Sequence, residues 1–395
     1  MLKNNLGFRL KYRSRDFLNS IINSLGGNGI YNIRGNHSKK DKRALVIYTL
    51  EAVSKHLSNT LHRFPSLTSH SGFNESISLL NCLLDAGYTV DYFHFVNTPK
   101  IEWSKYELVI DAFKNLQYSK LVIGQKKIFY STCCHWKTFY ENAYMHSESF
   151  FERNGILLYP DREFITNYSD NTSDIITCFG GKYQAESFGS NHLKVKQLNI
   201  STTFIPSYNF KKQIASKTKF LWYGGHGPFH KGLDLVVEAF LKMPNFELHI
   251  FGNIELNNEL FLWFQKKLNT SKNIIYHGWS TPESMYFQSY VRLCDSFVFA
   301  SSSEGGAGSV IQCMQFGLIP IINNSTAVDL DNNKFDIEGI NPKDQINSII
   351  EKAELFSRTE NQELEIYTEF LYNKYSTLNT IEMYELSLNS IIQEL

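Results

Sequence analysis

Short apolar runs alternate with amphipathic segments along the chain. The runs are rich in β-branched and aromatic side chains, which is typical of buried strands. The first series of predicted strands comprises 44–49, 89–96, 107–112, 127–132 and 174–179, and the second comprises 219–225, 246–253, 273–280, 296–302 and 318–322. Strands that alternate with helices form parallel sheets, so the pattern predicts an α/β fold with two Rossmann-like domains.

The amphipathic segments between these runs predict helices. Apolar side chains share one face in three of them, namely 74–87 (Ile77, Leu80, Leu83, Leu84), 233–243 (Leu235, Val236, Ala239, Phe240) and 377–392 (Ile381, Tyr384, Leu388, Ile391). A further helix is expected over 309–316. The segment from Glu51 to Gly72 is expected to be a loop, and its length favours a functional role.

The length of 395 residues favours two domains rather than one core. We expect a basic segment at 1–43, an N-terminal acceptor domain at 44–205, a C-terminal donor domain at 206–365 and a C-terminal helix at 366–395 that packs back on the first domain. The two domains would face each other across a cleft, since ligands of open α/β sheets bind beyond the carboxyl ends of the strands.

Composition excludes several classes of protein. The formal net charge is zero, so no global field favours nucleic acid. No apolar run is long enough for a transmembrane helix, and the N-terminus lacks the pattern of a secretory signal. The six cysteines have no metal-binding spacing, so we expect reduced thiols in a cytoplasmic protein.

Positive charge is concentrated at the N-terminus. Residues 1–43 contain ten Lys or Arg and two Asp, with apolar residues interleaved. This segment is either a basic amphipathic stretch that rests peripherally on the inner face of an anionic membrane, or a solvated leader folded onto the first domain.

The stretch SSSEGGAG joins a predicted strand to the helix that starts at Ser309. Gly305, Gly306 and Gly308 have no Cβ, so a ligand can approach their backbone amides, and the helix dipole favours a phosphate. Glu304 would repel a phosphate, so we expect it to accept hydrogen bonds from sugar hydroxyls. The alternative is a glycine turn with a solvated glutamate.

A second glycine-rich turn, YGGHGPFHKG, follows the first strand of the second series. Lys231 stands at the start of the next helix, where its ammonium group could reach the same phosphate. A solvated lysine is the alternative if the turn is considered alone. The two turns together favour a phosphate site.

Together these motifs resemble the nucleotide-binding half of GT-B glycosyltransferases, specifically glycosyltransferase family 4, the group 1 transferases. The resemblance spans about 219–330 and rests on Lys231-Gly232, Leu233-Asp234-Leu235, Glu238-Ala239-Phe240, Ser301, Glu304-Gly305 and Gly317-Leu318-Ile319-Pro320. The first half is similar only in the order of its elements, in a glycine-bearing loop before the first helix that contains His70 and Gly72, and in a histidine at a strand end, His135.

The resemblance implies a retaining hexosyltransferase of polysaccharide or glycoconjugate biosynthesis. Its partners would be a UDP- or GDP-sugar donor and a glycan or lipid-linked acceptor, with no nucleic acid, cofactor or metal. Glu304, Lys231 and His135 would be catalytic. The donor-binding residues would be Gly72, Gly225, His226, Gly305, Gly306, Gly308, Ser309 and Gln312. Asp329-Leu330-Asp331 has the form of a metal-binding Asp-x-Asp motif, but it is expected to be a chance occurrence.

Two positions depart from the family pattern. His226 stands where the family has an arginine, and it lacks the permanent charge and the bidentate geometry of a guanidinium. Gln312 stands where the family has a second glutamate, and its amide has one acceptor oxygen for the ribose hydroxyls instead of two. These changes indicate either a shifted donor geometry or a catalytically silent GT-B protein that binds a glycan or a partner transferase. A sugar-nucleotide 2-epimerase is a third alternative, and it would need additional acid/base carboxylates.

Overall fold

The computed structural model describes residues 29–59, 71–96, 98–162, 165–202, 213–214, 216–330 and 333–395. His70, Asp331, the first 28 residues of the basic segment and most of the predicted join between the domains lie outside the described residues. The chain divides into two compact units. Unit 1 comprises Met1–Ser131, Asn167–Thr177 and Glu385–Leu395, and unit 2 comprises Thr132–Thr166 and Cys178–Tyr384. The domain boundaries expected from the sequence remain predictions.

The first sheet has the strand order β1-β3-β2-β4-β5-β6-β7. Its strands are β1 (Gly29–Ile33), β2 (Arg43–Tyr48), β3 (Thr89–His94), β4 (Leu108–Asp111), β5 (Lys126–Tyr130), β6 (Ile175–Phe179) and β7 (Val195–Leu198). The pairs between β3 and β6 are parallel, whereas β1 runs antiparallel to β3. The five strands predicted in this half are confirmed, and β1 and β7 are additions that the sequence pattern did not predict.

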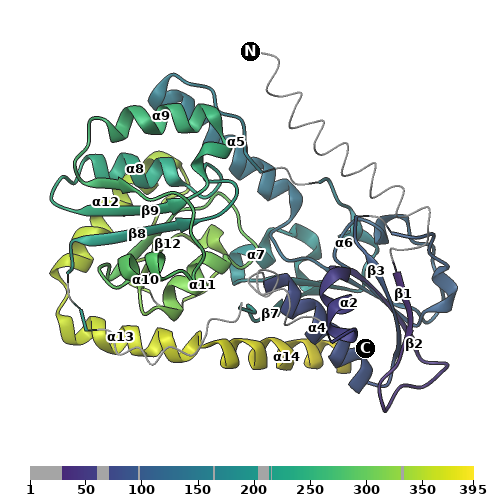
Figure 1. Ribbon diagram of the computed structural model, residues 1–395. Coiled ribbons are helices and arrows are strands. Elements are labelled where there is room, and N and C mark those ends of the chain that lie inside the picture. The colour runs from purple at the N-terminus through teal and green to yellow at the C-terminus, as the bar shows by residue number, and fades with distance from the viewer. Residues whose placement is uncertain are drawn as a thin grey trace. The chain divides into compact units, whose positions relative to one another are not determined.

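Helices α2 (Leu50–Leu57), α4 (Ser71–Asp85) and α6 (Ser169–Thr172) belong to unit 1 (Figure 1). The prediction of a loop from Glu51 to Gly72 is wrong at both ends, because α2 occupies its beginning and α4 already starts at Ser71. Gly72 therefore lies in the first turn of a helix. The end of α14 (Thr377–Gln393) also belongs to unit 1, where Ser78 donates a hydrogen bond of 2.6 Å to Glu385.

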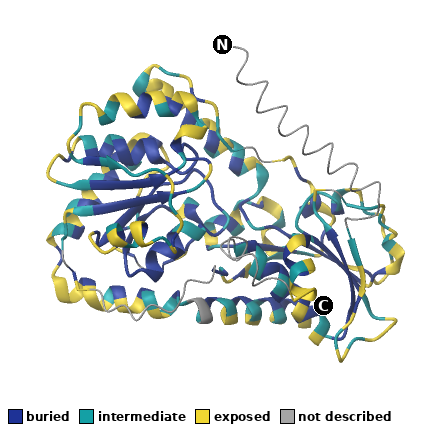
Figure 2. Cartoon of the chain, viewed as in Figure 1, coloured by how far each residue is buried: buried dark blue, intermediate teal, exposed yellow. Residues whose placement is uncertain are grey.

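The second sheet lies in unit 2 and is parallel throughout, with the order β10-β9-β8-β11-β12. Its strands are β8 (Lys219–Gly224), β9 (Glu247–Gly252), β10 (Ile274–Tyr276), β11 (Ser296–Phe299) and β12 (Ile319–Ile322). All five match predicted strands. The central strands of both sheets are buried (Figure 2).

Two hydrophobic cores cover the two faces of this second sheet. Phe220 and Trp222 of β8 belong to the core shared with α8 (Leu233–Leu241), α9 (Asn258–Leu268) and α12 (Pro342–Arg358). Leu221 and Tyr223 belong to the core shared with α10 (Met285–Val291), α11 (Gly308–Gln315) and α13 (Asn361–Lys374). Alternate residues of one strand thus point to opposite helical layers, as a strand buried on both faces requires.

Two helices differ from the expectation. The side chains of α8 are buried almost all round, including Asp234, so the predicted single inward face is too narrow. The segment after β5 forms α5 (Trp136–Asn154), a helix of 19 residues that the sequence analysis did not predict. The remaining short helices are α7 (Lys182–Glu186), η2 (Trp103–Lys105), η3 (Leu116–Tyr118), η4 (Gly189–Lys194), η5 (Ile254–Leu256) and η6 (Asn324–Thr326).

Candidate functional site

Two loops of unit 2 meet at the carboxyl edge of the second sheet. β8 and β11 are parallel neighbours, so the loops that leave them emerge side by side. The first loop ends at Lys231, and the second contains Glu304. Ser302 donates its backbone N–H to the carbonyl of His230 at 2.8 Å, and the Ser301 hydroxyl donates to the same carbonyl at 3.0 Å. The two glycine-rich turns are therefore joined into one structure.

Glu304 is held between two cations. Its Oε1 atom lies 3.0 Å from Nζ of Lys231, and its Oε2 atom lies 2.9 Å from Nη1 of Arg162. Glu304 and Lys231 are buried, whereas 38% of the Arg162 side chain is exposed. The cluster thus combines two positive charges with one negative charge. The Asp161 carboxylate adds a second negative charge nearby, and the Arg162 end of the cluster is open to solvent.

The charges within the cluster counteract the effect of burial on its ionisable groups. Burial opposes the charged form of Glu304, but the charges of Arg162 and Lys231 outweigh burial and lower the pKa of this carboxyl strongly. Burial lowers the pKa of Lys231, and the Glu304 carboxylate opposes this effect. Phe299 adds a cation–π contact, with its ring centroid 5.4 Å from Nζ of Lys231.

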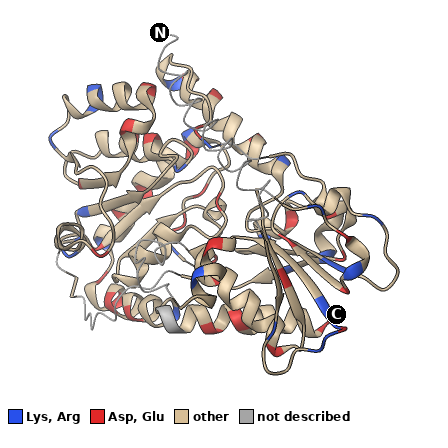
Figure 3. Cartoon of the chain, turned by 45° about the vertical axis from the view of Figure 1, so that its right-hand side comes forward, with Lys and Arg blue, Asp and Glu red and all other residues tan. Residues whose placement is uncertain are grey.

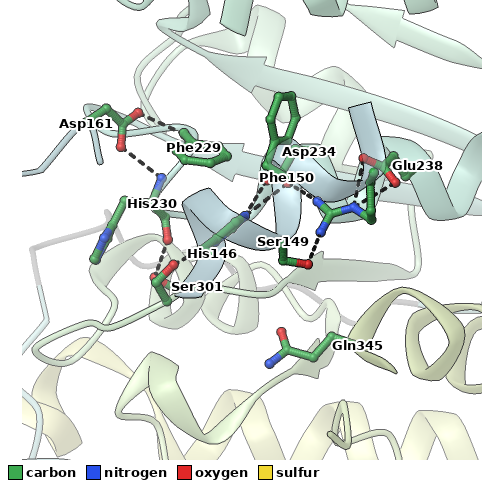
Figure 4. A network of polar contacts seen from close by, with 12 residues as sticks. His146, Ser149, Phe150, Asp161, Phe229, His230, Asp234, Glu238, Ser301 and Gln345 are labelled. Atoms are coloured by element: carbon green, nitrogen blue, oxygen red, sulfur yellow. Dashed lines mark hydrogen bonds and ion pairs between the residues drawn. The ribbon is translucent and has the colours of Figure 1, made fainter. Parts of the chain in front are cut away.

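His230 holds the lysine loop in place through contacts of its backbone and its side chain. Its backbone N–H and that of Phe229 both donate to the carboxylate of Asp161 at 2.9 Å, as Figure 4 shows. The imidazole stacks on Phe139 with a centroid distance of 4.8 Å, and its Nε2 atom contacts the carbonyl of Ser303. Burial lowers the pKa of His230 to about 3, so this side chain is neutral near pH 7. Its position fixes the backbone that presents Lys231.

A buried polar network supports the Glu304 loop from helix α5 (Figure 4). Nδ1 of His146 lies 2.7 Å from the Ser302 hydroxyl, and Nε2 lies 2.8 Å from Oδ1 of Asp234. Because a carboxylate only accepts, Nε2 carries the proton. Arg153 donates to Asp234 at 2.7 Å and to Glu238 at 3.0 Å. Asp234 of the Leu-Asp-Leu motif therefore holds the loop in place through His146.

Two glycines are required by close backbone approaches. A Cβ on Gly232 would lie 2.0 Å from the carbonyl oxygen of Ala300, and Gly232 has a φ of +67°. A Cβ on Gly305 would lie 1.9 Å from the carbonyl oxygen of Thr132. Protein backbone therefore fills the space on the Cβ side of Gly305, and the expected approach of a ligand to its backbone amide remains a prediction.

The other predicted donor-binding residues of the second half lie around the same two loops. Gly225 is half-buried and His226 is exposed. Gly306 is buried with a φ of +70°, and Gly308 opens α11. Ser309 and Gln312 follow on α11. The Ser309 hydroxyl is buried without a hydrogen-bond partner among the described residues, and 8% of Gln312 is exposed.

The two candidate residues predicted in the first half of the chain, His135 and Gly72, belong to different units. His135 is the N-cap of α5, where its Nδ1 atom accepts a hydrogen bond of 3.4 Å from the backbone of Lys137. Its ring also lies against Phe188 at a centroid distance of 5.6 Å. Gly72 lies in unit 1, where its carbonyl accepts a hydrogen bond of 2.6 Å from Ser76. The functional roles expected for His135 and Gly72 remain predictions.

Sequence reasoning missed Arg162. This residue lies 142 positions before Glu304, and no motif spacing links the two. Its side chain passes over the lysine loop, since a Cβ on Gly227 would lie 2.9 Å from Cγ of Arg162. The absence of an arginine at His226 was the available signal that another fixed positive charge was needed.

Within the described residues, no group of His, Cys, Asp or Glu has the arrangement of a metal site. None of the described helices is long and apolar enough to span a membrane.

Comparison with known proteins bears on the same half of the chain. Residues 204–363 match the family model described as glycosyl transferases group 1. This segment coincides with the two loops and the sheet that carries them. No curated protein sequence matches the chain. The family match supports a glycosyltransferase.

Solved structures extend the comparison to the fold. Anabaena Alr3699/HepE in complex with UDP-glucose has a TM-score of 0.51 at 10% identity, over 90% of this chain and 100% of that chain. The lipopolysaccharide outer core galactosyltransferase WaaB has a TM-score of 0.49 at 11% identity, over 90% of this chain and 100% of that chain. A mutant of S. aureus TarM has a TM-score of 0.44 at 14% identity. The match covers 73% of this chain but only 56% of the length of TarM. At such identities the HepE likeness shows the fold alone, and it confirms the α/β, GT-B architecture.

Proposed function

We propose that this protein is a cytoplasmic, retaining glycosyltransferase that moves a hexosyl group from a UDP- or GDP-sugar to a glycan or lipid-linked acceptor. One observation carries the proposal. The ammonium group of Lys231 is buried at the carboxyl edge of a parallel sheet, 3.0 Å from the carboxylate of Glu304 and beside the partly exposed Arg162. Buried charge of this kind costs free energy, which a site for a doubly charged diphosphate would explain.

The two cations of the cluster suit a departing diphosphate. Lys231 and Arg162 would donate to its oxygens and stabilise the negative charge that develops as the bond to the sugar breaks. Glu304 would then be released from part of its ion pairing and would accept hydrogen bonds from the hydroxyls of the sugar. In this arrangement fixed cations supply the stabilisation, so we propose a metal-independent reaction.

Arg162 takes the place of the arginine that the family pattern has at His226. Its guanidinium is permanently charged and can hold two phosphate oxygens at once, which an imidazole cannot do. Its stem crosses Gly227, the residue next to His226, so the charge reaches the same loop from another segment of the chain. We therefore interpret the departure at His226 as a relocation of charge and not as a loss of donor binding.

Several parts of the proposal rest on the resemblance alone. His135 would face the donor sugar, Gln312 would hold the ribose, and the amides of Gly306, Gly308 and Ser309 would hold the phosphate. The role in polysaccharide or glycoconjugate biosynthesis and the class of acceptor also rest on this resemblance.

A panel of UDP-, GDP- and ADP-sugars tests the proposal. Released nucleotide is measured with and without candidate acceptors, and the sugar nucleotide is followed by NMR. The proposal predicts nucleotide release with one donor and an α-configured product from an α-configured donor. Binding without turnover would identify a silent GT-B protein, and epimerised sugar nucleotide without release would identify an epimerase. Either result would contradict the proposal.

A further inference from the structure

The loop between β4 and β5 carries three large apolar side chains that unit 1 leaves in water. The exposed fraction is 69% for Tyr118, 92% for Leu121 and 97% for Ile123. Removing such side chains from water is favourable in proportion to their apolar area. Three of them on one short loop therefore form a tip that gains stability when something covers it.

Hydrogen bonds fix the loop on both sides of the exposed apolar side chains. Nζ of Lys127 donates to the hydroxyl of Ser119 and to the carbonyl of Lys120, both at 2.9 Å. On the other side, Gln125 donates to the carbonyls of Trp103 at 2.6 Å and Tyr106 at 2.8 Å. The apolar side chains between these anchors are thus presented by a tethered turn.

The charge of the tip has one sign. Residues 112–126 contain Lys114, Lys120 and Lys126 and no Asp or Glu. Other described segments differ in sign: α14 contains Glu382 and Glu385 and no Lys or Arg, whereas residues 187–202 contain Lys194 and Lys196 and no Asp or Glu (Figure 3). The neighbouring segment, which Gln125 and Lys126 contact, adds the exposed residues Glu102, Lys105 and Glu107, so lysines remain in excess around the loop. A surface that combines exposed apolar side chains with an excess of lysines is complementary to an anionic lipid bilayer, whose interface offers both hydrocarbon and phosphate.

We propose that the loop 118–126 docks the protein on an anionic bilayer. Leu121 and Ile123 would enter the boundary between headgroups and acyl chains, and Lys120 and Lys126 would contact lipid phosphates. A protein partner fits less well, because a specific protein interface buries on the order of 1,000 Å² and a tip of three side chains offers far less. The proposal concerns unit 1 and does not depend on the sugar-transfer activity.

Sedimentation of the full chain with vesicles tests the proposal. The vesicles are phosphatidylcholine with or without phosphatidylglycerol, and the test variant is L121D/I123D. The control is L193D/M285D, which adds the same two charges at apolar residues of unit 2 that are 83% and 87% exposed. We expect the partition coefficient on phosphatidylglycerol vesicles to fall about tenfold or more in the test variant. The control variant should change this partition coefficient less than about twofold, because salt screens the effect of charges that lie far from the membrane.

A site-specific probe makes the result independent of the basic N-terminal segment, which all variants retain. The six native cysteines are buried, so an environment-sensitive dye attached to I123C labels the tip selectively. Its emission should shift to the blue with phosphatidylglycerol vesicles, and a dye on L193C should not shift. The proposal is overturned if L121D/I123D binds vesicles like the parent, or if the parent does not bind them. It is also overturned if the parent is a dimer by analytical ultracentrifugation that L121D/I123D dissociates, since the tip would then join two copies.

Discussion

Nζ of Lys231 and Oε1 of Glu304 lie 3.0 Å apart although 73 positions separate the two residues in the sequence. Each belongs to a glycine-rich loop at the end of its own strand, and the parallel pairing of β8 and β11 brings the loops together. The central claim of our account is that this contact marks the place of a nucleotide diphosphate.

Lys231→Ala should lower kcat by roughly 100- to 1,000-fold, the loss typical for removal of one group that stabilises an oxyanion. The reason is that no other side chain of the lysine loop supplies a fixed charge. Initial rates with the best donor from the nucleotide-sugar panel measure the effect. Lys343→Ala, an exposed lysine at the start of α12, serves as the matched control. An unchanged kcat would make Lys231 a structural partner of Glu304 only.

Arg162→Ala should lower kcat/KM by roughly 10- to 100-fold, the range that follows from one or two charge-assisted hydrogen bonds. Arg162→Lys should recover only part of the loss, because an ammonium group lacks the guanidinium fork. If Arg162 replaces the arginine of the family pattern, then adding His226→Arg to the Arg162→Ala protein should restore activity in part. The relocation of charge that we propose does not survive if His226→Arg lowers activity further in that background.

Gln312→Glu should tighten UDP or GDP binding by about tenfold, since a carboxylate accepts hydrogen bonds from both ribose hydroxyls more strongly than an amide. Isothermal titration calorimetry at one pH and salt concentration measures the dissociation constants. Glu at this position would restore the family pattern. Equal affinity of the two proteins would place the ribose elsewhere.

Asp234→Ala should lower the free energy of unfolding by about 3–5 kcal/mol, because it leaves the Arg153 guanidinium buried with one partner fewer and His146 without its acceptor. Glu238→Ala should cost less, since the Glu238 side chain is 15% exposed and that of Asp234 is fully buried. Urea denaturation followed by circular dichroism gives both values. Equal losses would mean that the network does not depend on Asp234.

Stability should fall as the pH is lowered below about 6.5. The pKa of His230 is about 3 in the folded protein and about 6.5 in the unfolded chain, so the unfolded chain binds the proton first. The stability is therefore complete above the unfolded pKa and declines as the pH falls toward the folded one. The decline due to His230 alone amounts to about 2 kcal/mol at pH 5. His230→Gln should flatten the pH dependence between pH 7 and 5, and urea titrations at several pH values measure it. A slope equal to that of the parent would contradict the assignment to His230.

Apolar periodicity was sufficient to predict the strands of both sheets except β1 and β7, and the helices α4, α8 and α14. Leu80 and Leu83, for example, are buried on α4 as expected, and Tyr384 and Leu388 are buried on α14. The two motif loops were also predictable, because glycine turns between a strand and a helix are local features. The residues whose pattern predicts these elements lie close together in the sequence.

What could not be predicted depends on distant contacts. Helix α5 was missed because one of its core positions is a histidine. Phe139, Ala143, His146 and Phe150 are buried at helical spacing, yet His146 is buried only because Asp234 and Ser302 accompany it from elsewhere in the chain. Arg162 has no local signal for the same reason. The position of Gly305 against Thr132 likewise follows from a backbone approach that no residue pattern encodes.

A crystal structure of the protein soaked with UDP, and separately with GDP, tests the central claim most directly. We predict that one nucleotide places its diphosphate within hydrogen-bond distance of Nζ of Lys231 and of the Arg162 guanidinium, beside the turn that precedes Ser309. A nucleotide bound elsewhere, with Lys231 and Arg162 still paired only to Glu304, would contradict the account.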